Sequence, residues 1–383
     1  MALHFERAEF DRRKAAVVSE LNARKLDGLL MFQQESMFYL TGYDTFGFCF
    51  FQCLYLGSDG TLALLTRAPD YLQAKHTSLL EDIRIWKDEG GANPATQLRD
   101  MLDDLGAKGK TLGIEYDSYG LTAKNGKAVD AAMEGFAELH DASGLVDRIR
   151  VVKSDAELAY VRKAGALADE ALEEGLKLTL AGADEGDILA AMQGAVFSGG
   201  GDYPGNEFII GSGPDALLCR YKSGRRTLDP SDQLTLEWAG SYRHYHAAMM
   251  RTVIVGAPTA QHEKMLAACQ DALSAGEEVM KSGHTAGDVF DAHAAAMDSH
   301  GMRDHRMNAC GYSLGAKFTP SWMDWPMFYT GNDAELGPGM VFFAHMILMD
   351  AESGNAMCPG RSYIIGDDGP ECLSQLPVEM ICR

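Results

Sequence analysis

The sequence is short of positive charge. Its 34 lysines and arginines stand against 55 aspartates and glutamates, which gives a formal net charge of -21. A nucleic acid or an anionic membrane would be repelled by such a chain, so we expect neither as a partner. No apolar run reaches the length that spans a bilayer, and the first residues do not form an apolar signal segment. We therefore expect a cytoplasmic protein.

The cysteines lack the spacing of a metal-binding motif. All eight are scattered, and Cys49 and Cys53, the closest two, have no matching second pair. A structural zinc site is therefore not expected, and reduced thiols in apolar surroundings are. Cys219 and Cys310 have a second interpretation as thiol nucleophiles, although a small buried side chain is the simpler one.

The length and the hydrophobic pattern predict two domains. With 383 residues, 46% of them hydrophobic, the chain can bury two cores. Helices and strands alternate over residues 1–148, which predicts an α/β domain, with strands over 37–56 and 61–66. Over residues 149–383, two long helices precede a run of strands twice, which predicts an α+β domain with an internal two-fold repeat. Ser154 and Glu157 predict a capping box at its first long helix.

One stretch of the second domain places polar groups in an apolar pattern. Residues 234–256 read as two strands joined by a turn at Gly240 and Ser241. The two-residue period of a strand puts Glu237 on one face, and His244 and His246 share a face of the partner strand. A carboxylate and two imidazoles are costly to bury without a purpose, so we expect them to belong to a functional site.

Several stretches resemble the creatinase and aminopeptidase P family of "pita-bread" hydrolases. In chain order they are LVDRIRVVKSDAELAYVRKA (145–164), the stretch 211–256, GYSLG (311–315), ELGPGMVFF (335–343) and RSYIIGDDGPECLS (361–374). The resemblance covers nearly the whole chain. The resemblance implies a pita-bread catalytic domain and a creatinase-like N-terminal α/β domain. It also implies a homodimer in which the N-terminal domain of one subunit lies near the cleft of the other.

The resemblance breaks down at the metal ligands. Most of the family binds two metal ions through five carboxylate and histidine side chains, and these positions fall here on Glu237, Ala248, Tyr312, His345 and Gly360. One carboxylate remains of four, so the bridging ligands that neutralise paired cations are missing. The resemblance therefore implies a metal-free branch, to which creatinase and ectoine hydrolase belong, and no cofactor is expected.

A metal-free hydrolase needs a protein base or nucleophile. Glu237 is the first candidate for either role, His345 and His246 can exchange protons, and Tyr312 can donate to an oxyanion. These residues predict hydrolysis of a C–N bond in a small nitrogen-rich metabolite, with ectoine ring opening as the best guess from the resemblance. The alternatives are a creatinase-like amidinohydrolase and an Xaa-Pro peptidase-like protein that only binds. A single metal held by Glu237, His246 and His345 is also open.

Further side chains are candidates for binding the substrate. They are Cys219, Arg220, His244, Arg251 and Arg361, together with Tyr43, Asp44 and Phe46 of an N-terminal loop. Arginine can bind a substrate carboxylate, and aromatic residues with an acid suit a small cationic ring. Three of these interpretations have structural alternatives. Arg251 can pair with Glu237, each histidine can be an ordinary core residue, and the loop over 41–48 can be a buried sheet edge.

Overall fold

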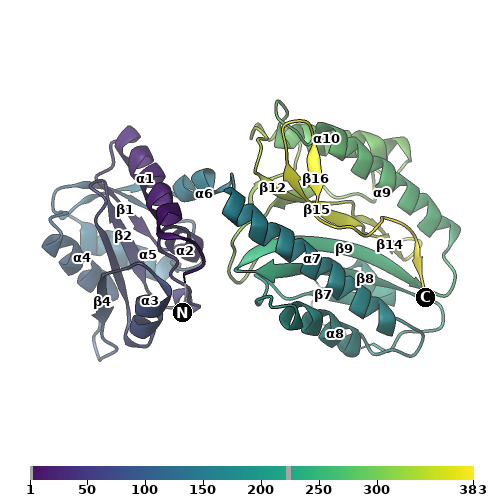
Figure 1. Cartoon of the computed structure of the whole chain (residues 1–383), viewed down its shortest axis with the longest axis horizontal. Coiled ribbons are helices and arrows are strands. Elements are labelled where there is room, and N and C mark those ends of the chain that lie inside the picture. The colour runs from purple at the N-terminus through teal and green to yellow at the C-terminus, as the bar shows by residue number, and fades with distance from the viewer. Residues whose placement is uncertain (1–2, 221–225) are drawn as a thin grey trace. The chain divides into compact units, whose positions relative to one another are not determined.

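The structure is a computed structural model that describes residues 3–220 and 226–383 (Figure 1). The chain forms two compact units, Met1–Arg150 and Val151–Arg383. Within the described ranges, none of the helices combines the length and the apolar composition that crossing a membrane requires.

The first unit is built on a six-stranded sheet with the order β4-β3-β2-β1-β5-β6. β2 is antiparallel to both of its neighbours, and the other pairs are parallel. The strands are β1 (Gly28–Met31), β2 (Cys53–Gly57), β3 (Leu62–Arg67), β4 (Asp82–Trp86), β5 (Thr111–Ile114) and β6 (Glu138–Asp141). Both faces of the sheet carry buried apolar residues, as a sheet between two helical layers requires.

Helices supply the two covering layers of the first unit. They are α1 (Arg7–Ala23), α2 (Gln34–Thr41), α3 (Tyr71–Thr77), α4 (Pro94–Asp104), α5 (Ala123–Met133) and α6 (Leu145–Arg150), with short 3-10 turns at Gly47–Cys49 and Ala68–Asp70. Leu98 of α4 and Val129 of α5 belong to one core. Val17 of α1 and Leu145 of α6 belong to the other. The predicted α/β architecture of this part of the chain is confirmed.

The predicted strand that begins at Met37 is wrong, because Gln34–Thr41 forms α2 and β2 begins only at Cys53. The start of this helix is held by a distant side chain. Glu115, after β5, accepts hydrogen bonds from the backbone N–H groups of Phe32 (3.0 Å) and Gln33 (2.9 Å) and from Ser36 Oγ (2.6 Å). Phe32 and Gln33 directly precede α2, so this carboxyl group fixes the backbone that leads into the helix from outside the local sequence.

The second unit has a nine-stranded sheet with the main order β11-β10-β12-β15-β9-β8-β7, while β16 pairs with β15 and β17 with β9. The strands are β7 (Ile209–Ser212), β8 (Asp232–Tyr242), β9 (Tyr245–Val255), β10 (Gly311–Ser313), β11 (Asp324–Met327), β12 (Val341–His345), β15 (Gly360–Ile365), β16 (Pro370–Cys372) and β17 (Ile381–Cys382). A separate hairpin contains β13 (Leu348–Asp350) and β14 (Asn355–Met357).

Four long helices precede these strands in pairs: α7 (Asp155–Leu178) and α8 (Glu185–Ser198), then α9 (Ala260–Val279) and α10 (Ala286–Ser299). The predicted capping box of α7 is confirmed, since Ser154 and Glu157 make both of its bonds. In Figure 1, α7 crosses β8 and β9, and Trp238 Nε1 donates to the carbonyl oxygen of Ala168 on α7 at 2.9 Å. Trp238 therefore faces the helices, and Glu237, one residue earlier, faces the opposite side of the sheet.

The turn between β8 and β9 is formed by Arg243 and His244 and not, as predicted, by Gly240 and Ser241. Tyr242 pairs with Tyr245, and the two turn residues have φ values of 54° and 66°. Positive φ at both positions matches a two-residue hairpin turn whose twist follows that of the strands. The longer hairpin sets a register in which Glu237 lies opposite Met250 and Ser241 opposite His246.

Candidate functional site

The candidate site is centred on the carboxyl group of Glu237, on the face of β8 away from the helices. Tyr312, on β10, donates its hydroxyl proton to Glu237 Oε1 (3.2 Å) and accepts a hydrogen bond from Trp322 Nε1 (2.8 Å). Burial raises the pKa of Glu237 to about 7, and the Tyr312 hydrogen bond and the charge of Arg220 oppose that rise. Glu237 is nevertheless only half-buried, so solvent reaches part of it. A carboxyl group in this state can exchange protons near neutral pH.

His345 lies at the end of β12 on the same face as Glu237. It pairs with Gly360, which pairs with Met250, which in turn lies opposite Glu237. The centroids of the His345 and Tyr312 rings are 5.7 Å apart. Burial, together with the nearby charge of His293, lowers the pKa of His345 to about 3, so its ring is neutral at pH 7. Its Nδ1 is buried and has no hydrogen-bond partner among the described residues.

Arg220 and Cys219 approach this centre from the segment that follows β7. Arg220 is exposed, and its charge acts on the pKa values of Glu237, Tyr312 and His345. Cys219 Sγ lies 3.8 Å from Met349 Sδ. Burial and then the charge of Glu237 raise the pKa of Cys219, which disfavours the thiolate that a nucleophile needs. The structure thus brings together four sequence candidates, Glu237, Tyr312, His345 and Arg220, with Cys219 beside them.

His246 is not part of this group. It shares the face of Glu237 but lies four residues along β9 from Met250, a separation of about 13 Å at the rise of a strand. Its Nε2 accepts from the backbone N–H of Gly205 (2.8 Å), and its Nδ1 lies 3.3 Å from the carbonyl oxygen of Gly315. Burial lowers its pKa to about 3. A ring with both nitrogens engaged is a structural histidine, so the predicted catalytic role is corrected.

His244 is also placed differently from the prediction. It is a turn residue whose ring stacks on Phe318 with centroids 4.2 Å apart, and its backbone N–H donates to Asp202 at 3.2 Å. The turn lies beyond His246 when counted from Glu237, so the strand register keeps His244 away from the centre. The substrate-binding role predicted for it is therefore corrected.

Arg251 and Arg361 lie on the other face of the sheet. Arg251 lies opposite Leu236, the residue before Glu237, and Arg361 lies opposite Ala344, the residue before His345. Because side chains alternate between the faces of a strand, both arginines point away from the Glu237 face. One guanidinium nitrogen of Arg251 donates to the carbonyl oxygens of Met250 and Gly360, both at 2.8 Å. These arginines neither pair with Glu237 nor reach a substrate beside it, so both predictions for them are corrected.

The N-terminal loop candidates have local roles in the first unit. The Tyr43 side chain is buried and its hydroxyl donates to Gln52 Oε1 at 3.2 Å. The backbone N–H of Asp44 donates to Thr77 Oγ1 at 3.1 Å. Phe46 is 76% exposed, which leaves its ring available for contact with a partner or ligand. The substrate-binding role predicted for this loop stays a prediction.

The residues of the site do not fit the two-metal centre that most of the family binds. Among residues 3–220 and 226–383, no three His, Cys, Asp or Glu side chains converge to hold an ion. His246, about 13 Å along β9 from Met250, does not join Glu237 and His345 in one such group. At Gly360, where the family's second glutamate falls, a Cβ would lie 2.7 Å from two ring atoms of Phe343 and 3.1 Å from Met250 Cβ. Apolar side chains thus occupy the space that a metal-binding glutamate would need.

Sequence reasoning missed two contributors to this centre. Trp322 is not among the sequence candidates, but its indole N–H donates a hydrogen bond to the Tyr312 hydroxyl. Phe343 read only as part of a strand, but its ring fills the space over Gly360 and packs edge-on against Tyr312, with ring centroids 5.4 Å apart. The register of β10 and β12 brings these residues together, and no local sequence pattern encodes that register.

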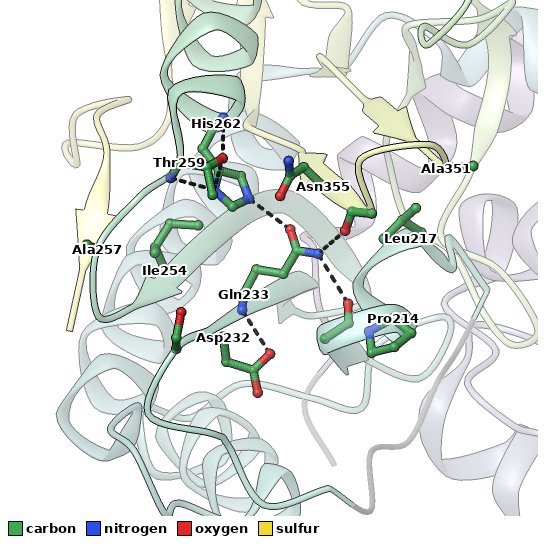
Figure 2. A pocket seen from close by; sticks show the side chains of 13 residues that line it. Pro214, Leu217, Asp232, Gln233, Ile254, Ala257, Thr259, His262, Ala351 and Asn355 are labelled. Atoms are coloured by element: carbon green, nitrogen blue, oxygen red, sulfur yellow. Dashed lines mark hydrogen bonds between the residues drawn. The ribbon is translucent and has the colours of Figure 1, made fainter.

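A pocket of about 470 Å³ lies at the start of β8, away from the candidate residues (Figure 2). Its wall includes Gln233, His262, Pro214 and Leu217. None of the candidate site residues lines it, so this pocket is distinct from the centre at Glu237.

Comparison with known proteins agrees with this architecture. Residues 159–366 match the model of metallopeptidase family M24, and residues 13–152 match the creatinase/prolidase N-terminal domain. An ectoine hydrolase of Halomonas elongata is 28% identical, over all of this chain and 99% of the relative. An uncharacterised hydrolase/peptidase of Sinorhizobium fredii is likewise 28% identical, with the same coverage.

Solved structures share the fold. A prolidase from Thermococcus sibiricus superposes with a TM-score of 0.88 at 19% identity, covering 98% of this chain and 99% of that one. The predicted pita-bread domain with a creatinase-like N-terminal domain is therefore confirmed. Since the family model spans more than half of the sequence, the chain belongs to metallopeptidase family M24, a family of hydrolases, although its site lacks that family's metal ligands.

Proposed function

We propose that this protein hydrolyses a C–N bond of a small nitrogen-rich metabolite without a metal ion, and that the reaction is the opening of the ectoine ring. The observation that carries the proposal is the Glu237 carboxyl group, half-buried, hydrogen-bonded by Tyr312 and with a pKa near 7. The end-to-end similarity to an ectoine hydrolase supports the choice of substrate.

Glu237 acts as the base and then as the acid. Its carboxylate takes a proton from a water molecule, whose oxygen attacks the amidine carbon. The proton held by Glu237 then passes to the leaving nitrogen, the C–N bond breaks, and the carboxylate is restored. A pKa near 7 suits both transfers, because a much stronger or weaker acid would perform one of them poorly.

The neighbouring side chains bind and orient the substrate. Neutral His345 presents a ring whose Nδ1 has no partner within residues 3–220 and 226–383, and a buried nitrogen in that state favours a ligand that supplies one. The Tyr312 hydroxyl has one proton and directs it to Glu237, so it orients the base in the free enzyme. Arg220 supplies a positive charge that can pair with a substrate carboxylate.

The test combines metal analysis with turnover. The purified protein is assayed for bound transition metals and for hydrolysis of ectoine, hydroxyectoine, creatine and Xaa-Pro dipeptides, before and after chelation. We expect no stoichiometric metal, ectoine turnover that survives chelation, and loss of turnover in Glu237→Gln. Glu263→Gln, at an exposed position on α9, is the matched control and should retain activity.

Three results would contradict the proposal. Turnover that requires a bound metal would exclude the metal-free mechanism. Full activity of Glu237→Gln would remove the base. Binding of one compound, seen as a raised melting temperature, without hydrolysis of any would favour a binding module in place of an enzyme.

A further inference from the structure

Gln233 connects three segments at the start of β8 (Figure 2). Its Nε2 donates to the carbonyl oxygens of Gly213 (3.2 Å) and Gly354 (2.6 Å). Its Oε1 accepts from the backbone N–H of Ala356 (2.9 Å) and bonds to His262 Nε2 (3.0 Å). A primary amide has two donor hydrogens and two acceptor lone pairs, and all four are used here. The side chain is 7% exposed, so losing these bonds would leave buried polar groups unpaired.

His262 determines which way this amide points. Its Nδ1 accepts a hydrogen bond from the backbone N–H of Thr259 (3.2 Å), so the ring proton lies on Nε2 and is donated to Gln233. The oxygen of the amide must then face His262, and its nitrogen must face the two carbonyl groups. The amide orientation is thus fixed by the start of α9.

The first segment held by Gln233 leads to one side of the candidate site. Gly213 begins the 3-10 helix Gly213–Leu217, and the chain reaches Cys219 and Arg220 directly after it. Thr235, two residues after Gln233 on the same face of β8, adds a second tie by donating to the carbonyl oxygen of Ala216 at 2.9 Å. This short segment is therefore pinned twice to β8 before it reaches Arg220.

The second segment leads to the adjoining side. Gly354 and Ala356 belong to the β13–β14 hairpin, whose Met349 contacts Cys219. The chain continues from β14 to Cys358, whose backbone N–H donates to Thr252 Oγ1 at 2.9 Å. Thr252 lies opposite Thr235, so the polar side chains of one face of β8 and β9 hold both segments.

We infer that Gln233 is a positioning residue for the site at Glu237, because it fixes the backbone segment that carries Arg220 to that carboxyl group and the hairpin whose Met349 contacts Cys219. The inference rests on the proposed function for its effect on catalysis, although the tether itself can be measured without any substrate. A residue that touches neither Glu237 nor the substrate thereby controls where the substrate-binding cation lies. The hydrogen bonds of Gln233 to these segments form the tether, and Gln233 itself lines the pocket at the start of β8.

Amide hydrogen exchange tests the tether directly. In Gln233→Leu, which keeps the size of the side chain and removes its polar atoms, we expect exchange to accelerate about tenfold or more over residues 213–220 and 354–358, because the hydrogen bonds that hold both segments are lost. Exchange in the centre of β8 and β9 should stay unchanged. Gln261→Leu is the matched control, since Gln261 bonds to Asp350 of the same hairpin but not to the Gly213 segment.

A second variant guards against misfolding of the first. Gln233→Glu keeps the shape and the acceptor oxygens. When protonated it can still donate to one carbonyl, and when ionised it repels both. We expect near-normal exchange of residues 213–220 at low pH and accelerated exchange at high pH. Unchanged exchange in both variants, or an acceleration spread evenly over β8 and β9, would overturn the inference.

Kinetics then separate the inference from the proposed function. If ectoine is hydrolysed, Gln233→Leu should raise KM more than it lowers kcat, and the matched control should change neither. Turnover with unchanged exchange would leave the proposed function standing and refute the tether. Altered exchange in an enzyme that hydrolyses none of the compounds would support the tether and refute the proposed function.

Discussion

At the scale of single residues, Glu237 and His345 of the site respond to burial in opposite ways. Burial raises the pKa of Glu237 to about 7 and lowers that of His345 to about 3, because it disfavours the charged form of each. Near neutral pH the carboxyl group therefore titrates and the imidazole does not. Of these two side chains, only Glu237 can gain and lose a proton near neutral pH.

The pH dependence of activity should report this proton. We expect kcat/KM to rise with pH through about 7 as Glu237 ionises, with no step from His345 in the range where the protein is folded. The measurement is a pH–rate profile of ectoine hydrolysis. In Tyr312→Phe the hydrogen bond that lowers the pKa of Glu237 is lost, so the rise should move to higher pH. A rise that stays in place in this variant would contradict the assignment.

A second prediction concerns the lost metal site. Gly360→Glu restores a carboxylate to a family ligand position, but its Cβ would meet the rings of Phe343 and the Met250 side chain at 2.7–3.1 Å. We expect a lower melting temperature and no bound transition metal, measured by calorimetry and metal analysis. Gly194→Glu, at a position with open space around its Cβ, is the control and should leave the melting temperature nearly unchanged. Stoichiometric metal in Gly360→Glu would show that the site still accepts an ion.

At the scale of elements, α7 lies directly on the backbone of β8. A Cβ at Gly240 would approach the carbonyl oxygen of Ala164 to 1.9 Å and the backbone nitrogen of Ala168 to 2.7 Å. Helix and strand can pack this closely only where the side chain is absent. The glycine thus keeps α7 near Trp238, whose indole also bonds to the helix.

Gly240→Ala should therefore destabilise the second unit. We expect the free energy of unfolding to fall by about 1–3 kcal/mol or more, as for other overpacked positions, with the loss measured by chemical denaturation. Gly194→Ala is the counterpart, since this glycine lies inside α8 with open space at its Cβ and should gain about 0.5–1 kcal/mol. Equal stability of the two variants would show that α7 can move away from β8.

Elements with local signals could be predicted from the sequence. The capping box of Ser154 and Glu157 fixes the start of α7 within a few residues of chain, and the period of β8 gave the correct face for Glu237. The start of α2 could not be predicted, because the backbone that leads into it is held by Glu115, about eighty residues away. The hairpin turn was misplaced because Arg243 and His244 adopt positive φ without glycine or asparagine.

The site was predicted in part for the same reason. Family-like spacing identified Glu237, Tyr312 and His345, and these do lie together. The two arginines were assigned wrongly because their face depends on pairing across several strands, where a shift of one residue exchanges the faces. His246 lies on the predicted face but farther from Glu237 than predicted, since the turn lies three residues beyond its predicted place.

At the scale of the whole molecule, buried ionisable groups set the pH dependence of stability. Burial lowers the folded-state pKa of His246 and His345 to about 3 and that of His293 to about 4, and also lowers that of His262. Between these values and the ordinary 6.5, the unfolded chain binds more protons, so these groups make stability rise with pH. Glu237 and Glu115 act oppositely above 4.5, because their folded pKa values are raised to about 7 and about 8.

We therefore expect the melting temperature to rise from pH 4.5 to about 6.5, where four histidines outweigh two carboxyl groups, and to decline between about 6.5 and 8. Calorimetry across this range measures the profile. Glu237→Gln removes one of the carboxyl groups and should flatten the decline. A melting temperature that falls steadily from pH 4.5 would show that the histidines are not held neutral in the folded state.

The arrangement of the nine-stranded sheet has a consequence for how the second unit responds to a ligand. Its two halves, β7-β8-β9 and β10-β12-β15, meet where β9 and β15 share one residue pair, Gly360 and Met250, whereas β8 and β9 are paired along their full length. Glu237 comes from one half, and Tyr312 and His345 come from the other. The hydrogen bond from Tyr312 to Glu237 therefore joins the two halves of the sheet, whose strands β9 and β15 share a single residue pair. A substrate that contacts both halves would hold them together, so we expect the whole sheet to become stiffer when the site is occupied.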